Sequence, residues 1–119
     1  MGKYGNYDSV EDIACAYLKE YRHYYVDDLG YTRDGGGIDI IAHTYGNMQL
    51  HFIYIEESGV ISSDEVWESR ERAAHDYIAT HDATDYLYIS FDAMHVNIGA
   101  SGRIAVITYS EGCHEYAAA

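Results

Sequence analysis

The sequence has no proline, only two cysteines and only seven basic residues, against twenty acidic ones. It contains no run of roughly 18 uncharged apolar residues, the length that a membrane-spanning helix needs. No basic start followed by an apolar core marks a secretion signal. Two cysteines argue against a disulfide framework, and Cys15 is expected on the apolar side of a helix. These absences predict a soluble, cytoplasmic protein without a membrane partner.

The formal net charge of −13 at pH 7 narrows the class of partner. Such a charge repels nucleic acid phosphates at long range and favours solubility or a basic protein partner. Nucleic acid is still a possible partner, but the negative charge of the protein disfavours its binding. A surface adapted to a salty solvent would show the same composition.

The length of 119 residues fits one domain and is too short for two independent cores. Hydrophobic residues make up 48% and charged residues 23%, close to the average of globular domains. We therefore expect a single folded domain over residues 1–119, with flexible ends at residues 1–8 and 113–119.

Two amphipathic helices are predicted from apolar residues at helical spacing. Ser9 can cap the first, and the pattern continues to Tyr21. Ser62 or Ser63 can cap the second, which ends near Thr80. The predicted buried side of the second helix consists of Val66, Trp67, Arg70, Ala73, Ala74, Tyr77 and Ile78.

The segment between the two helices is predicted to contain three strands. A short strand over residues 24–31 bends into a turn, and a glycine loop over residues 33–37 follows it. A hairpin comes next, with one strand from Ile38, a turn at Gly46 and Asn47, and a returning strand over residues 50–55.

Two or three further strands are predicted after the second helix. Residues 86–91 form a strand that residues 93–98 extend or follow, and residues 103–109 form another. A helix between residues 50–55 and 86–91 allows these two strands to pair in parallel through a right-handed connection. The expected fold class is α/β, a mixed sheet flanked by two helices.

Acidic residues of the hairpin are the first candidates for a functional site. Asp39 lies inside one strand, and Glu56 and Glu57 close the next, so carboxylates of neighbouring strands can converge on one face and bind a metal. Strand alternation points Glu57 to the other face, which discounts it. His51 is expected to be a surface residue.

Several segments, in the same order along residues 8 to about 112, resemble the YraN-like family, a branch of the restriction-endonuclease-like PD-(D/E)XK superfamily. The first helix matches its Gly-Glu-x-x-Ala and Tyr-Leu residues, and the two hairpin strands stand where that family has Gly-Glu-Ile-Asp-Leu-Ile and Phe-Val-Glu-Val-Lys. The matching segments are Glu11-Asp12-Ile13-Ala14 with Tyr17-Leu18, Gly36 to Ala42, Phe52 to Glu56, Arg70 to Ala74 with Tyr77-Ile78, Ser90-Phe91-Asp92-Ala93, and Gly102-Arg103.

This resemblance implies a restriction-endonuclease-like fold and a Mg²⁺- or Mn²⁺-dependent site. The superfamily holds the metal with an aspartate and a second acid, and a lysine two residues further helps to activate water. Here Asp39 is kept, but Tyr54 stands at the acid position, Glu56 at the lysine position, and Gly37 replaces a glutamate. The implied catalytic positions are therefore Asp39, Tyr54 and Glu56. The remaining acids that could bind a metal weakly are Glu11, Asp39 and Glu56.

Each acid also has an explanation without function. Asp39 can accept hydrogen bonds from backbone amides, Glu56 can be a solvated acid at a strand end, and Glu11 can be a first-turn acid favoured by the helix dipole.

Three hypotheses about function follow. The first is a nuclease-fold protein with lost or weak hydrolysis that acts as a binding or accessory module. The second is an active metal-dependent nuclease that uses Glu11, Asp39 and Glu56. The third is an acidic interaction module that binds a basic protein or mimics DNA. Whether the protein is an enzyme is left open by the sequence.

Overall fold

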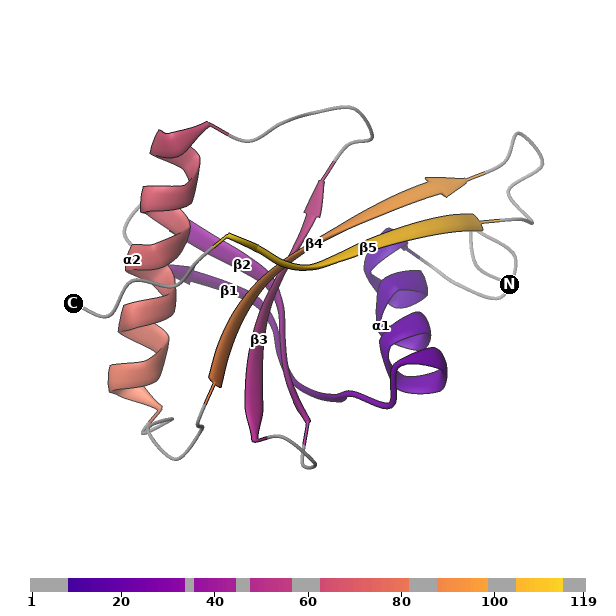
Figure 1. Cartoon of the computed structure of the whole chain (residues 1–119), viewed down its shortest axis with the longest axis horizontal. Helices are drawn as coiled ribbons and strands as arrows, with labels where there is room; N and C mark the ends of the chain where they lie inside the picture. The colour runs from indigo at the N-terminus through magenta and orange to yellow at the C-terminus, as the bar shows by residue number, and fades with distance from the viewer. Residues whose placement is uncertain are drawn as a thin grey trace.

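The computed structural model describes residues 9–33, 36–44, 48–56, 63–81, 88–98 and 105–114. These ranges form two helices and five strands (Figure 1). In chain order the elements are α1 (Val10–Tyr21), β1 (Tyr25–Arg33), β2 (Gly36–Thr44), β3 (Gln49–Glu56), α2 (Asp64–Thr80), β4 (Tyr88–Ile98) and β5 (Ala105–His114).

The five strands form one mixed sheet in the order β1-β2-β3-β4-β5. Strands β1, β2 and β3 are antiparallel neighbours, β3 and β4 are parallel, and β4 and β5 are antiparallel. The parallel pairing predicted for these two strands is confirmed. The strands are parallel because α2 connects the end of β3 to the opposite end of the sheet, where β4 begins. The fold is α/β, as expected.

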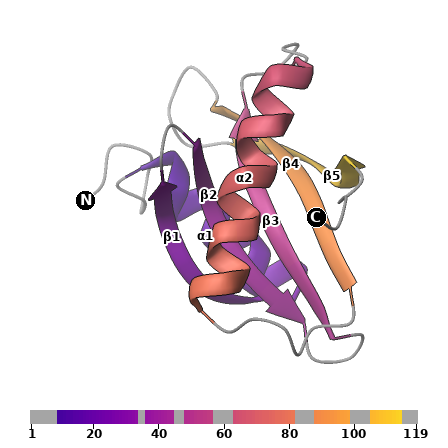
Figure 2. The same cartoon turned by 90° about the vertical axis from the view of Figure 1, so that its left-hand side faces the viewer.

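The two helices cover opposite faces of the sheet (Figures 1 and 2). The core on the α2 side is built around Phe52, Tyr54, Tyr77 and Phe91. The core on the α1 side contains Leu18 from the helix and strand residues that point to the α1 face of the sheet, among them Ile40, Ile53 and Met94. Strand alternation thus sends neighbouring residues into two separate cores.

Helix α1 begins as the sequence predicts. The Ser9 side chain accepts a hydrogen bond from the Asp12 backbone amide, and two acids occupy the first turn. The helix ends at Tyr21. His23 then adopts a positive φ of 57°, and the Tyr24 amide donates to the Leu18 carbonyl.

Helix α2 is capped by Ser63, which accepts from the Val66 amide, and it ends at Thr80 as predicted. Ala73, Ala74 and Tyr77 are buried against the sheet. Val66 is predicted on the buried side, but this residue of the first turn is 41% exposed. Tyr31 of β1 donates a hydrogen bond to Asp76 and ties the helix to the edge strand.

The strands are longer than the sequence indicates. β1 continues to Arg33 because a bulge after Val26 and a left-handed Gly30 absorb the residues that suggest a turn. Gly36 and Gly37 were assigned to a loop, but both pair with β1.

The two ends of the predicted domain lie partly outside the described residues. Cys113 and His114 were expected to be flexible and instead complete β5, where His114 stacks on Trp67 of α2. The predicted turn at Gly46 and Asn47 and the side chain of Glu57 lie outside the described residues. Neither described helix is long and apolar enough to cross a membrane.

Candidate functional site

The candidate site lies where β2 and β3 separate. These strands pair from Thr44 and Gln49 as far as Ile40 and Ile53. Beyond that point, among the described residues, β2 pairs only with β1, and β3 pairs only with β4. The sheet therefore forks, and Asp39, Tyr54 and Glu56 lie at the fork.

Asp39 occupies the fork itself. Its Oδ2 accepts a hydrogen bond of 2.7 Å from the Ile55 amide, which has no carbonyl of β2 opposite it. Burial raises the pKa of the Asp39 carboxyl above its ordinary value, and this effect outweighs the opposing effects of the Ile55 amide and the Arg70 charge. Asp39 therefore accepts a hydrogen bond from a backbone amide, which is the structural role that the sequence analysis gives as its alternative to metal binding.

Glu56 forms an ion pair with Arg70 from α2. Its Oε2 lies 2.8 Å from Arg70 Nη2, and the two side chains are only 10% and 14% exposed. The prediction of a solvated strand-end acid is therefore wrong, because α2 packs over this end of β3. The Arg70 guanidinium supplies the positive charge beside this carboxylate.

Arg70 is fixed by aromatic side chains as well as by its ion pair. Its Cζ lies 4.3 Å from the centre of the Tyr54 ring and 4.4 Å from that of Trp67. Cation–π contacts of this kind strengthen when the cation is removed from water. The guanidinium therefore has a defined place between β3 and α2.

Tyr54 stands at the position where the resemblance requires an acid. The residue is 2% exposed, and its ring packs on Trp67 and Phe91 in the α2-side core. Burial raises the pKa of its phenol well above the ordinary value, so the group is neutral at physiological pH. A neutral phenol is a poor ligand for Mg²⁺ or Mn²⁺.

Three buried polar atoms around this ion pair make no hydrogen bond: Tyr54 Oη, Arg70 Nη1 and His95 Nε2. His95 pairs with Glu56 in the β3–β4 register, but its Nε2 is 3.8 Å from Glu56 Oε1. Buried polar atoms usually have a hydrogen-bond partner, so these three atoms are the unsatisfied polar groups of the candidate site.

Glu11 lies on the exposed first turn of α1, close enough that its charge, like that of Glu56, raises the pKa of Asp39. The fold thus brings all three predicted metal ligands into one electrostatic neighbourhood. In the described part of the chain, however, no three His, Cys, Asp or Glu side chains are arranged to hold a metal ion. Arg70 and the Ile55 amide are the observed partners of Glu56 and Asp39.

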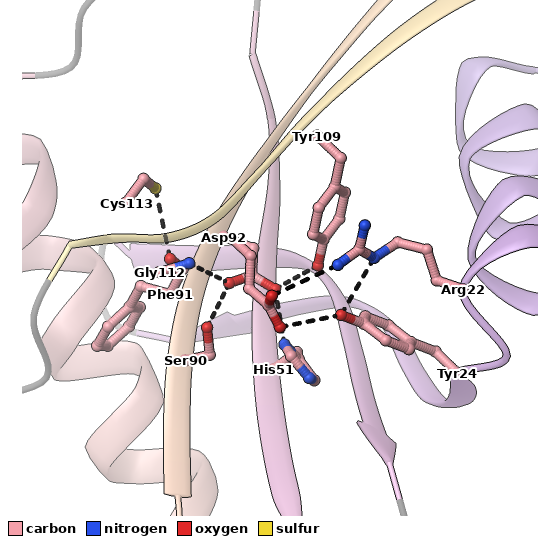
Figure 3. A network of polar contacts seen from close by, with 10 residues as sticks. Arg22, Tyr24, His51, Ser90, Phe91, Asp92, Tyr109, Gly112 and Cys113 are labelled. Atoms are coloured by element: carbon pink, nitrogen blue, oxygen red, sulfur yellow. Dashed lines mark hydrogen bonds and ion pairs between the residues drawn. The ribbon is translucent and has the colours of Figure 1, made fainter.

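A second polar cluster lies on the α1 side of the sheet, around Asp92 of β4 (Figure 3). Asp92 is fully buried, and His51 Nδ1 lies 2.7 Å from its Oδ2. Its other partners are the hydroxyls of Ser90 and Tyr109 and the Gly112 amide, the last at 2.9 Å. The carboxylate thus joins β3, β4 and β5.

The Asp92 carboxylate is stabilised in its charged form. Burial by itself would raise the pKa of Asp92, but the hydrogen bonds that it accepts outweigh burial and lower the pKa below its ordinary value. Because Asp92, His51 and Ser90 are buried and the donors come from three strands, we assign this cluster a structural role.

The rim of the cluster reaches towards α1. Tyr24 stacks on His51 with ring centres 4.4 Å apart and donates to Glu111, and Arg22 pairs with the same acid at 3.5 Å. Arg22 also lies over the Tyr109 ring.

The sequence missed Arg70, His95, Asp92 and His51 as members of polar clusters. His51 was expected at the surface but is fully buried. A single carboxylate inside the apolar segment 88–94 was an available signal, because a buried charge requires partners. The partners themselves depend on the strand register, which the sequence does not specify.

Neither models of known protein families nor curated proteins give a significant match to this chain.

Proposed function

We propose that this protein is a YraN-like, restriction-endonuclease-like domain that acts as a binding or accessory module with lost or weak metal-dependent hydrolysis. The observation that carries the proposal is the Glu56–Arg70 ion pair beside the buried Tyr54 at the sheet fork.

The arrangement of elements supports the nuclease-like part of the proposal. A helix, three antiparallel strands, a second helix and a parallel fourth strand follow one another, and the helices lie on opposite faces. Asp39 lies where β2 and β3 diverge, at the position that the resemblance assigns to the metal-binding aspartate.

The chemistry of the fork supports the loss of hydrolysis. A divalent cation at Glu56 would have to displace or repel the Arg70 guanidinium, which is held by two aromatic rings. The phenol at position 54 offers no negative charge, and no lysine follows it at position 56. The residues present therefore do not fit a Mg²⁺ or Mn²⁺ site.

A comparison of the full chain with Asp39→Asn tests this proposal. Asparagine retains an acceptor for the Ile55 amide but removes the charge that a metal ligand needs. Glu68→Gln, at an exposed acid of α2, is the matched control. We expect calorimetric titration with Mn²⁺ and a plasmid-nicking assay with Mg²⁺ or Mn²⁺ to give the same results for all three proteins.

Strong metal-dependent nicking by the unmodified protein that Asp39→Asn abolishes and Glu68→Gln retains would overturn the proposal. That result would favour the active nuclease. Fluorescence anisotropy with labelled DNA and RNA at low salt tests the binding role separately. Binding without cleavage is the expected result, and it should weaken as salt is added.

A further inference from the structure

The outer edge of the sheet is formed by β5, and the first six residues of this strand carry no charge. From Ala105 to Ser110 the strand contains neither acidic nor basic residues, and no proline interrupts it. Within the described residues, no strand pairs with this edge. An uncharged edge strand presents free backbone donors and acceptors to another strand.

The opposite edge of the sheet is protected. In β1 a bulge follows Val26, Asp27 and Asp28 lie at the bulge, and Gly30 has a left-handed conformation. Charges, bulges and irregular backbone are common means of preventing edge pairing. The two edges of the sheet are therefore not equivalent.

The start of β5 also extends beyond most of the sheet. β3 pairs with β4 only as far as His95, so Val96 to Ile98 pair with β5 alone among the described residues. Figure 1 shows β4 and β5 leaving the sheet together, away from α2.

Alternation along β5 leaves one of its faces uncovered. Ile107 and Tyr109 pack on the α1-side core, whereas Val106, Thr108 and Ser110 are exposed. Val106 is 60% exposed.

We propose that β5 pairs with β5 of a second copy of this chain, antiparallel across a two-fold axis at Thr108, to join the two sheets. A second copy fits this edge better than a basic peptide, because residues 105–110 offer no carboxylate to a cation and Glu111 already pairs with Arg22. The charge of −13 on each copy opposes approach elsewhere, so the uncharged edge is where two copies repel each other least. The proposal does not depend on the function proposed above.

The two-fold axis makes specific predictions about neighbours. Thr108 lies opposite its own equivalent, and Val106 lies opposite Ser110 of the second copy, so uncharged residues face each other at the centre, and Glu111 faces only Ala105. The same surface is used by both copies, which closes the assembly at a dimer. Residues directly opposite on antiparallel strands have Cβ atoms roughly 4.5–5.5 Å apart, within reach of a disulfide after small adjustments.

Cysteine cross-linking tests the pairing directly. In a Cys15→Ala/Cys113→Ser background, Thr108→Cys is expected to give a disulfide-linked dimer on mild oxidation. Val106→Cys and Ser110→Cys alone should remain monomeric on a non-reducing gel but cross-link when mixed. All three positions are exposed, so the substitutions leave the cores unchanged.

Sedimentation velocity over a range of protein concentrations gives the second measurement. We expect Thr108→Lys to weaken dimerisation at least about tenfold, because two lysines face each other at the axis. Leu29→Lys, at a 53% exposed site on the opposite edge strand, should leave the dimer unchanged. Added salt should strengthen the dimer by screening the repulsion between the copies.

A monomer at every concentration and salt would overturn the proposal. So would a dimer that Thr108→Lys does not weaken, or cross-linking of Val106→Cys equal to that of Thr108→Cys. Association that weakens with salt would also contradict it, since that dependence belongs to pairing of opposite charges.

Discussion

Three aspartate side chains accept hydrogen bonds from backbone amides where the sheet is irregular. Asp28 accepts from the Leu29 amide at the β1 bulge, and Asp39 accepts from Ile55 at the fork. Asp92 accepts from Gly112, which has a positive φ of 65° at the bulge between β4 and β5. In each case a carboxylate accepts a hydrogen bond from a backbone amide, so part of the acidity of this chain serves the backbone.

The Asp92 carboxylate should make the stability of the protein sensitive to acid. Its folded pKa is lowered, so its contribution is fully present above the ordinary pKa of 3.8 and is lost as the pH falls through the folded pKa. We expect Asp92→Asn to lower the free energy of unfolding by about 3 kcal/mol at pH 7. Urea denaturation between pH 7 and pH 2.5 measures both effects.

The control for this prediction is Glu68→Gln, which should retain the acid dependence of the unmodified protein. The contribution of Asp39 to stability depends on pH in the opposite direction. Its pKa is raised in the folded state, so its contribution falls as the pH rises through the folded pKa. A difference between Asp92→Asn and the unmodified protein that does not shrink below pH 4 would contradict the role given to this carboxylate.

At the scale of elements, the end of α1 contains a local strain. His23 takes the left-handed conformation directly after the helix, where glycine is the favoured residue. The imidazole is exposed, so replacing it removes little packing.

We expect His23→Gly to be more stable than His23→Ala by about 1 kcal/mol, because glycine adopts a positive φ without steric cost. Thermal and urea denaturation of the two variants provide the comparison. Equal stability of the two variants would show that the helix end relaxes to another conformation when the histidine is removed.

The helices were predictable because their signals are local. Ser9 and Ser63 are caps next to apolar residues at helical spacing, and both helices begin and end where these signals indicate. The parallel pairing of β3 and β4 followed from the intervening helix. The bulges in β1 and β5 and the fork between β2 and β3 were not predictable, because each depends on contacts between distant segments.

The candidate site was predictable only in part for the same reason. Sequence reasoning placed Asp39, Tyr54 and Glu56 on neighbouring strands, and they lie together at the fork. It put Arg70 on the buried side of α2 without identifying Glu56 as its partner, since that pairing depends on how the helix packs on the sheet.

At the scale of the whole molecule, the net charge of −13 is spread over a chain with seven basic residues. Two of these form ion pairs in the described part of the chain, Arg22 with Glu111 and Arg70 with Glu56. The remaining acids repel one another, and this repulsion is relieved when the chain unfolds.

We therefore expect sodium chloride to stabilise the folded protein by screening this repulsion. The melting temperature should rise between low salt and roughly physiological ionic strength and then level off, as the Debye length falls to about 8 Å. Differential scanning fluorimetry at constant pH and low protein concentration measures the change apart from dimerisation. A melting temperature that falls with salt would show that attractive ion pairs dominate.

The Asp92 cluster also has a consequence for the folding of the chain during synthesis. Two of the donors to this buried carboxylate, the Tyr109 hydroxyl and the Gly112 amide, come from β5. A nascent chain that has emerged only as far as β4 would have to bury Asp92 without them, which opposes folding. We therefore expect the sheet to become stable only after residue 112 has left the ribosome, so that folding follows the synthesis of β5 instead of accompanying it.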